Sequence, residues 1–394
     1  MINKSKIVKT ITACVPGTAC NFKCKYCYIG NCCDEDHRTP TKFLYSVEHM
    51  IKAFSPERLG GIADIIVIGN GETLLPPEVV PFIKGLLKQG HVVELATNLT
   101  LNDRVDELLN MSKENLSRLV MRPSFHYNEL KRLNKIDDFF NNLNKFREAG
   151  SACIPFMVIC NEYMPVLDEI KSLFQNKFGA MPQCTPTLTY EKKSDINRFG
   201  KVQTDPIITQ ELKNLIKEKF NSNIFDLCCD YLNVDPKQVF CYAGKYSFTV
   251  TLDNGNVQKC HCAPPEFSMF KDLNRSLDME AIGSNCCINT CAMQYQFIAQ
   301  GLLENCAEDL THYSLVWKDR ENYCNEEVKR LLNFNYLQEN LKYTDSQKEQ
   351  INKQVKDKYE EYNFNLLKPS LKNIIRYKIY KYFENELIKR KLIK

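Results

Sequence analysis

The sequence predicts an α/β fold in which strand–helix units are arranged around a parallel sheet. From the N-terminus to about residue 225, short apolar runs of strand length alternate with amphipathic stretches of helical period, which is typical of βα units. Polar residues and glycines follow several of these runs, as they do where parallel strands end at a ligand-binding edge. After Leu227 the chain becomes rich in cysteine, and from about Ser314 its pattern is helical.

Six segments carry the strand pattern, because each is short, mainly apolar and bounded by turn residues. They are Lys9–Cys14, Asp64–Gly69, Val92–Thr97, Arg118–Phe125, Ala152–Cys160 and Gln183–Tyr190. Pro123 lies inside the fourth segment, where a strand interior usually has no proline.

Five segments between or after these strands have the helical period. They are Ser46–Phe54, Pro76–Lys88, Asn102–Met111, Asp137–Ala149 and Tyr163–Phe178. Asp103 and Asp137 are suited to the first turns of their helices, where a negative charge is favourable.

Length and composition exclude several classes of protein. A chain of 394 residues is long for one compact core, so we expect a main domain with additions. The 52 Lys and Arg nearly balance the 48 Asp and Glu, so no DNA partner is expected. No stretch of signal-peptide or membrane-spanning type is apparent, and we predict a cytoplasmic protein. In that reducing compartment, the 19 cysteines are expected to bind metal or to be buried thiols.

Cys20, Cys24 and Cys27 form the most informative motif, because three thiolates at this spacing can hold three irons of a four-iron cluster. The fourth iron stays open, and an open metal position indicates a reactive site rather than a structural one. Structural or electron-transfer iron–sulfur clusters normally take four thiolates. The alternatives are half of a zinc knuckle, although no second half follows at the usual spacing, and a redox dithiol.

Residues 13–28, which read Ala-Cys-Val-Pro-Gly-Thr-Ala-Cys-Asn-Phe-Lys-Cys-Lys-Tyr-Cys-Tyr, resemble the cluster loop of the radical S-adenosylmethionine (SAM) superfamily. The resemblance implies an open, partial (β/α)6 barrel, and the six predicted strands agree with it. It also implies that Cys20, Cys24 and Cys27 carry a catalytic [4Fe-4S] cluster whose open iron binds SAM. Reductive cleavage of SAM there would release a 5′-deoxyadenosyl radical that abstracts a substrate hydrogen.

The end of the second strand is similar to the Gly-Gly-Glu-Pro stretch that binds the amino group of SAM in this family. Gly71, Glu72 and Thr73 are the matching SAM-binding candidates, with Asn70 and Thr73 in place of the first glycine and the proline. Glycines allow close approach of a ligand, and a glutamate accepts bonds from an ammonium group. A simple turn with a solvated glutamate is the alternative.

Asn98 ends the third strand and is similar to the Thr-Asn-Gly end of this strand in the family, although Leu99 stands where glycine is commoner. The resemblance makes Asn98 a candidate SAM contact. Alternatively, its side chain caps the helix that follows.

Arg122, Ser124 and His126 share one face of the fourth strand, because strand side chains alternate. By resemblance, Ser124 matches a position that contacts SAM, whereas Arg122 and His126 are candidate catalytic, substrate or SAM contacts. For His126, a satisfied structural histidine is favoured over a catalytic one. Asn161, at the end of the fifth strand, is similar to a polar SAM-binding residue of the family.

A second set of cysteines follows Leu227. Cys241-x13-Gly255-x4-Cys260, around a predicted hairpin, resembles the opening of the SPASM and Twitch extensions of the same superfamily, which bind an auxiliary [4Fe-4S] cluster. A full SPASM pattern would continue with a Cys-x2-Cys that this chain lacks, so we expect one auxiliary cluster rather than two. We assign it to Cys241, Cys260, Cys287 and Cys291. The reserve ligands, each alternatively a small buried hydrophobe, are Cys262, Cys286 and Cys306.

We divide the chain into a radical SAM barrel at 1–226, an auxiliary-cluster domain at 227–312 and a helical extension at 313–394. Tyr343–Tyr362 reads as a solvated helix. Ser370–Lys394 reads as a basic amphipathic helix that either docks on the protein or contacts an anionic membrane, and docking is favoured.

The function expected from these observations is a radical SAM enzyme that abstracts a hydrogen from a small polar metabolite, such as a sugar, an aminocyclitol or a modified nucleobase. A maturase of ribosomally made peptides or proteins is the alternative. A non-catalytic iron–sulfur or zinc sensor is the alternative from another class. A flavodoxin- or ferredoxin-type protein is the expected electron donor.

Overall fold

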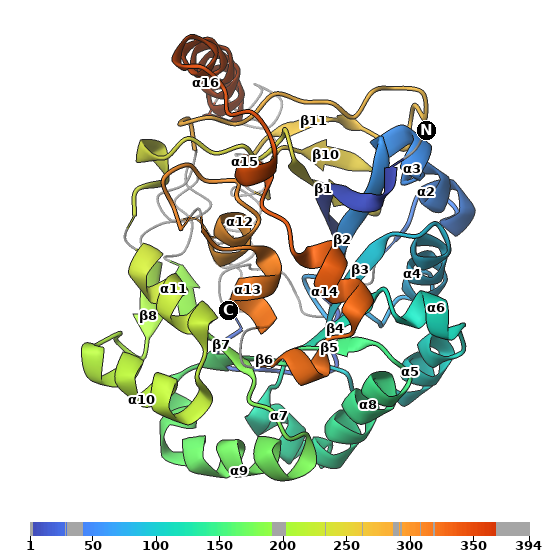
Figure 1. The fold of residues 1–394 in the computed structure, drawn as a ribbon, viewed down its shortest axis with the longest axis vertical. Coiled ribbons are helices and arrows are strands. Elements are labelled where there is room, and N and C mark those ends of the chain that lie inside the picture. The colour runs from blue at the N-terminus through green and yellow to red at the C-terminus, as the bar shows by residue number, and fades with distance from the viewer. Residues whose placement is uncertain are drawn as a thin grey trace, which may run out of the picture.

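The computed structural model describes residues 3–27, 29, 42–190, 202–232, 234–261, 263–286, 291, 294–307, 309–317 and 320–367. It is a mixed α/β fold in which helices surround a curved, mostly parallel sheet (Figure 1). The last predicted helix, Ser370–Lys394, lies outside the described residues, so its docking or membrane contact stays a prediction. Within the described residues, no helix is both long enough and apolar enough to cross a membrane.

The larger sheet has eight strands in the order β11-β10-β9-β1-β2-β3-β4-β5. Its parallel part runs from β9 through β1 to β5, and the pairs β9–β10 and β10–β11 are antiparallel. The bounds are β1 Asn3–Val15, β2 Gly61–Gly69, β3 Val92–Thr97, β4 Leu119–Pro123, β5 Ala152–Cys153, β9 Ser247–Thr251, β10 Asn256–Gln258 and β11 Pro265–Ser268.

A second sheet continues the curve with β6, β7 and β8. These strands span Phe156–Ile159, Gln183–Tyr190 and Val202–Asp205. A single bridge between Ser124 and Phe156 joins the end of β4 to β6, so the two sheets form one open, barrel-like wall. The predicted strand Ala152–Cys160 is therefore two strands, and Pro155 lies at the break because it has no N–H to donate to a ladder.

Helices cover the outside of this wall (Figure 1). They are α2 Val47–Ala53, α3 Pro56–Leu59, α4 Val79–Lys88, α5 Asn102–Leu109, α6 Lys113–Leu116, α7 Tyr127–Arg132, α8 Ile136–Glu148, the 3-10 helix η1 Asn161–Val166, α9 Leu167–Lys177, α10 Gln210–Phe220 and α11 Asn223–Tyr231. The five predicted helices are all present. Asp103 and Asp137 stand in the first turns of α5 and α8, as expected.

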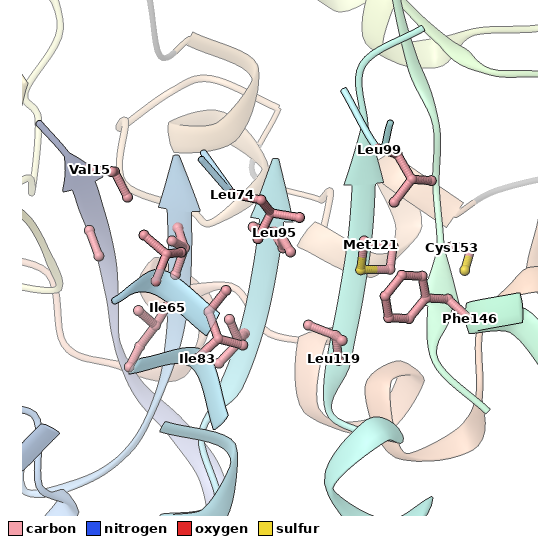
Figure 2. Packing of buried hydrophobic residues seen from close by; sticks show 14 of the residues in the cluster. Val15, Ile65, Leu74, Ile83, Leu95, Leu99, Leu119, Met121, Phe146 and Cys153 are labelled. Atoms are coloured by element: carbon pink, nitrogen blue, oxygen red, sulfur yellow. The ribbon is translucent and has the colours of Figure 1, made fainter. Parts of the chain in front are cut away.

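The main core lies between the sheet and these outer helices. Figure 2 shows Ile65, Leu95 and Met121 from neighbouring strands beside Ile83 of α4 and Phe146 of α8. All five side chains are completely buried. Burial of side chains of this size stabilises the fold by about 1.5–3 kcal/mol each, so the outer layer is held mainly by apolar packing.

The C-terminal third closes the inside of the curved wall. It contains η2 Pro236–Gln238, α12 Gln294–Ala299, α13 His312–Trp317, η3 Glu321–Tyr323, α14 Glu326–Leu332, α15 Tyr336–Glu339 and α16 Asp345–Leu367. Trp317, Leu332 and Tyr336 belong to one buried cluster with the strand residues Ile62 and Val92. The other face of β2 and β3 is thus covered by the chain's own C-terminal segment.

The predicted hairpin is present and extends the barrel sheet. Its first strand, β9, pairs with β1 in parallel, with Thr10 opposite Ser247 and Cys14 opposite Thr251. Gly255 makes the turn at φ +73°, where a Cβ would lie 2.4 Å from Phe270. The proposed boundary near residue 227 therefore divides two parts that share one sheet.

Candidate active site

Cys20, Cys24 and Cys27 lie on one loop directly after β1, at the edge where the parallel strands end. Burial is the main reason why the pKa of Cys20 is raised to about 11, and the nearby Glu72 and Cys27 contribute to the rise. Burial also raises the pKa of Cys24, with contributions from Cys27 and Cys20. Three mutually repelling thiolates need positive charge beside them, so this loop fits a cluster of ferric and ferrous ions bound to thiolate sulfur.

Gly71 allows the end of β2 to lie directly against the cluster loop. A Cβ at position 71 would stand 1.9 Å from the carbonyl oxygen of Ala19, the residue before Cys20. The Glu72 N–H donates to the same oxygen at 2.9 Å. Position 71 therefore requires glycine because two protein backbones pack closely there, in addition to any ligand that approaches it.

The Glu72 carboxylate ties the ends of β2 and β3 together. Its oxygens accept from the Leu74 N–H at 3.0 Å, the Thr97 hydroxyl at 2.5 Å and the Asn98 N–H at 2.8 Å. Burial raises the pKa of Glu72, and these three bonds oppose the rise. The side chain is only 5% exposed, so the alternative of a solvated glutamate in a plain turn is wrong.

Asn98 holds the cluster loop through its side chain. Its Nδ2 donates to the Asn21 side-chain oxygen at 2.7 Å, and its Oδ1 accepts from the Thr100 hydroxyl at 2.7 Å. Helix α5 begins after Leu101, which has no side-chain cap. The alternative that Asn98 caps this helix is therefore wrong. Leu99 has a φ of +59°, a left-handed conformation that explains why glycine suits this position.

One further contact with the loop lacked any signal in the sequence. The buried Glu129 accepts from the Lys23 N–H at 2.7 Å and is itself bound by Arg132 at 2.9 and 2.7 Å. The spacing of three between Glu129 and Arg132 predicts a helical ion pair, but it does not predict the partner on the loop.

Tyr26 lies between Cys24 and Cys27 and anchors the loop to the N-cap of α7 and to η1. Its hydroxyl is 2.7 Å from His126 Nδ1 and 2.8 Å from the Tyr163 hydroxyl. Burial lowers the pKa of His126 to about 4, so the ring is neutral near pH 7. This geometry gives His126 a positioning role on the cluster loop.

Arg122 points into the interior of the barrel and is already paired there. It is 8% exposed, donates to Glu94 at 2.5 Å and to the Tyr295 hydroxyl at 2.8 Å, and stacks over Phe156. A guanidinium held in this way has its charge balanced by protein groups. In this structure Arg122 is held by protein groups, and its role as a catalytic, substrate or SAM contact stays a prediction.

The remaining SAM candidates fall into different positions. Thr73 is buried and accepts from the Gly69 N–H at 3.0 Å, which closes the turn after β2. Ser124 is partly exposed at the end of β4. Asn161 donates from an exposed side chain to Asp205 of β8. Their contact with SAM stays a prediction.

A cavity of about 260 Å³ opens at the ends of β1 and β2. It is lined by Val15, Pro16, Gly17, Ala19, Gly69, Gly71, Glu72, Leu75, Pro76, Pro77 and Glu78. Ligand pockets usually measure about 300–1,000 Å³, so this cavity is of a size for part of a nucleoside-containing molecule. It brings Gly71 and Glu72 together with the start of the cluster loop.

The second cysteine set also gathers in space. The buried Cys241 interacts electrostatically with Cys291, Cys260 and Cys286, and burial raises its pKa well above the ordinary value. Cys286, a reserve ligand, thus lies near Cys241, whereas Cys287 and Cys262 lie outside the described residues, so their assignments stay predictions.

Cys306, the remaining reserve, is buried and interacts electrostatically with Tyr231. This contact gives no indication that it joins the set around Cys241.

Solved structures with a similar arrangement include Streptococcus suis SuiB bound to S-adenosylmethionine, at 12% identity and a TM-score of 0.46, covering 68% of this chain and 64% of that chain. Others are native anSMEcpe with bound AdoMet, at 16% identity and 0.46, covering 91% and 98%, and BtrN in complex with AdoMet and 2-DOIA, at 13% and 0.28, covering 82% and 93%. The chain thus spans less than two thirds of the SuiB chain. No curated protein matches the sequence.

The model of the radical SAM superfamily matches residues 14–171. This range begins just before the cluster loop and ends within α9, so it contains Cys20, Cys24, Cys27 and every loop contact described above. Residues 14–171 therefore form a radical SAM domain, the domain of a superfamily of enzymes that use a [4Fe-4S] cluster and S-adenosylmethionine.

Proposed function

We propose that Cys20, Cys24 and Cys27 hold the catalytic [4Fe-4S] cluster and that the chain abstracts a hydrogen atom from a small polar substrate. When bound, the cluster and SAM together supply a 5′-deoxyadenosyl radical. The observation that carries this proposal is the loop itself, whose backbone and side chains are bound by residues from β2, β3 and the start of α7.

The chain's own residues have two tasks in this proposal. Glu72, Asn98 and Glu129 hold the cluster loop against the strand ends, which limits the positions the three thiols can take. Gly71 and Glu72 line the cavity beside the loop, so we assign them to the SAM amino group. Glu72 already accepts three bonds, which leaves about one acceptor site of a carboxylate for a ligand.

We assign one auxiliary [4Fe-4S] cluster to Cys241, Cys260, Cys286 and Cys291. Four thiols gathered in one place match the usual ligand number of such a cluster. An auxiliary cluster of this kind can take up an electron from a substrate radical or bind the substrate.

A small substrate is favoured because the chain fills much of its own barrel. Tyr295 binds Arg122, His312 lies 2.8 Å from Glu94, and the Tyr336 hydroxyl lies 3.0 Å from that of Thr10. These contacts leave the strand-end edge for the substrate. A peptide or protein substrate remains the alternative.

The decisive experiment supplies SAM and dithionite to anaerobically reconstituted protein and measures 5′-deoxyadenosine. We expect its formation in the wild-type chain and its loss in C24A. A wild-type protein that binds four irons at the loop and forms no 5′-deoxyadenosine would falsify the enzyme assignment. Flavodoxin and ferredoxin can replace dithionite in the same assay to test the expected electron donor.

Substrate class is tested separately by adding panels of sugars, aminocyclitols, nucleobases and peptides to the same reaction. A member of the metabolite panels that raises 5′-deoxyadenosine formation supports the proposal. Stimulation confined to peptides would contradict it.

A further inference from the structure

Asp64, Glu94 and His312 form a buried cluster inside the barrel, apart from both sets of cysteines. They come from β2, β3 and the first turn of α13. Each offers one ligand atom, and these atoms all lie within 4.8 Å of one another. The three residues are at most 1% exposed, so the cluster is sealed from solvent.

The sheet register brings the two acidic residues together. Asp64 is opposite Val92 and Ile66 is opposite Glu94, so Asp64 and Glu94 are diagonal neighbours on the same face of the sheet. This face looks into the barrel, away from the outer helices. His312 reaches it from a helix more than two hundred residues later, at 2.8 Å from Glu94 Oε1.

The second oxygen of Glu94 accepts from Arg122 at 2.5 Å. A guanidinium bonded in this way favours the ionised form of the carboxyl. The other oxygen, Oε1, lies on the side of His312, where an ion between the three side chains would be.

Asp64 is completely buried, and neither of its carboxyl oxygens has a hydrogen-bond partner in the described part of the chain. His312 Nδ1 has none either. Burial and the adjacent Glu94 raise the pKa of Asp64 well above its ordinary value. Protonation would remove the charge, yet it would leave the new hydroxyl without an acceptor, and buried unpaired polar groups are costly.

We propose that Asp64, Glu94 and His312 bind a divalent metal ion of the type that accepts mixed carboxylate and imidazole ligands, such as Mn²⁺ or Zn²⁺. Arg122 would hold Glu94 in place from the far side of its carboxylate, as outer-shell partners of metal ligands do. The ion would occupy the space that the unpartnered Asp64 oxygens face.

The geometry is close to what such an ion requires. Ligand atoms bonded at about 2.0–2.2 Å to one ion lie at most about 4.4 Å apart, and the three ligand atoms here lie within 4.8 Å of one another, which is close to that limit. One imidazole and two carboxylates suit these ions, whereas iron–sulfur clusters require thiolates. The site is thus chemically distinct from both cysteine sets.

The ion would link the C-terminal segment to the barrel. His312 begins α13, while Asp64 and Glu94 belong to central strands of the sheet. Binding that occurs only in the folded chain stabilises the fold by mass action. The ion would therefore hold in place the segment that closes the barrel, and it takes no part in the proposed radical chemistry.

The test uses full-length, anaerobically purified protein with its iron–sulfur clusters, produced in Mn²⁺-supplemented medium and, separately, incubated with MnCl2. Mn²⁺ is the probe because it prefers oxygen and nitrogen ligands over the chain's thiols. Bound manganese is counted by elemental analysis, and free Mn²⁺ is followed by its EPR signal. The variants are D64N and H312Q, with D106N as the control, since Asp106 is an exposed carboxylate paired with Lys145.

We expect about one Mn²⁺ per wild-type and D106N chain and at least about tenfold weaker binding in D64N and H312Q. Mn²⁺ should raise the Tm of the wild type by several degrees and leave that of D64N unchanged. Without added metal, D64N should be at least as stable as the wild type, because it removes a buried, unpaired carboxyl. An unchanged iron content and visible spectrum show that D64N is folded.

Three outcomes overturn the proposal. Equal Mn²⁺ binding by wild type and D64N would place the ion elsewhere. If the wild type retains no Mn²⁺ after growth in supplemented medium or after incubation with MnCl2, Asp64 would instead be a protonated carboxyl beside a buried water. A Tm increase of the same size in D64N would show that Mn²⁺ stabilises the chain at another place.

Discussion

The two cysteine regions of this chain reach similar chemistry by different means. Cys20, Cys24 and Cys27 lie on one short loop, whereas the set around Cys241 is drawn from separate segments between residues 241 and 291. The first set can be recognised from the spacing of its cysteines in the sequence alone. The cysteines of the second set come together only when the chain is folded, and Cys286 is one of those that lie near Cys241.

The regions also differ in how their backbones are held. The first loop is bound by residues at the ends of neighbouring parallel strands, which any βα fold places at one edge. In the second region, the segment before Cys286 is held by α16, because the Asn352 Oδ1 accepts from the Ser284 N–H at 2.8 Å. The Asn285 side chain also donates to the Asn352 carbonyl oxygen at 2.8 Å. The first loop is thus held by neighbouring strand ends of the barrel, whereas the second set of cysteines depends on a helix that lies far away in the sequence.

The largest expected effect separates the two sets directly. C24A should lower 5′-deoxyadenosine formation by at least about a thousandfold, because the radical initiator is lost. C286A should remove about four irons per chain while leaving SAM cleavage without substrate largely intact. Iron analysis and product quantification measure both effects.

C153A is the control for this pair, since Cys153 is a buried thiol whose hydrogen-bond acceptors are the carbonyl oxygens of Leu143 and Ser151. It should retain all iron. Loss of SAM cleavage in C286A to the level of C24A would contradict the division of roles.

Substituting Gly71 should disturb only the first region. In G71A the new methyl group overlaps the backbone at Ala19, which cannot move without displacing Cys20, so we expect destabilisation by about 1–3 kcal/mol. SAM cleavage should fall by at least about tenfold, since misplacing reacting groups is costly. The rate of 5′-deoxyadenosine formation and thermal unfolding are the measurements.

G69A is the matched control, because its Cβ would meet Thr73 at the milder distance of 3.3 Å. Equal losses in the two variants would indicate that the turn after β2, rather than its contact with the cluster loop, is sensitive.

Acid should weaken the first region through His126. Its pKa in the folded chain, about 4, lies below the value of about 6.5 expected when unfolded, so the unfolded chain binds more protons between these values. Stability should therefore fall by about 2–3 kcal/mol as the pH falls from 6.5 towards 4. Urea unfolding of the cluster-free chain, followed by circular dichroism, measures the slope.

H126Q should flatten this dependence in part. The buried His91, with a pKa also lowered to about 4, contributes a remaining slope of the same sign. An identical pH profile in wild type and H126Q would refute the role of His126.

The smallest expected effect concerns the distant support of the second region. N352A removes the acceptor for the Ser284 N–H and should cost about 1 kcal/mol. Iron of the auxiliary cluster should be lost faster to a chelator, whereas SAM cleavage should be unchanged. Q354A, an exposed change on the same helix, is the control. Equal iron loss in both variants would show that the contact between α16 and the segment before Cys286 does not stabilise the auxiliary cluster.

Much of the barrel could be predicted because each strand and helix carries its own pattern. β3 and β7 have the predicted bounds, since residues 92–97 and 183–190 are short runs flanked by turn residues. The break between β5 and β6 at Pro155 and the pairing of β9 with β1 were missed. Both depend on which neighbour a strand meets, and this information is absent from the strand's own residues.

For the site residues, too, the sequence identified several positions, but only the structure showed their partners. Glu72 and Asn98 were identified from their place at strand ends, but their actual partners, Thr97 and Asn21, required the folded structure. Arg122 was placed on the interior face correctly. Its engagement by Glu94 was not foreseen, because the two residues lie on different strands and meet only through the sheet register.

The sequence by itself determined the cysteine loop, the order of strands and helices and the polar residues at the strand ends, because these features depend on spacing within a few residues. Only the tertiary structure decided that Cys286 joins Cys241 and that His312 meets Asp64 and Glu94 inside the barrel. Contacts between residues so far apart arise from the packing of the C-terminal segment into the barrel, and packing is a property of the whole chain.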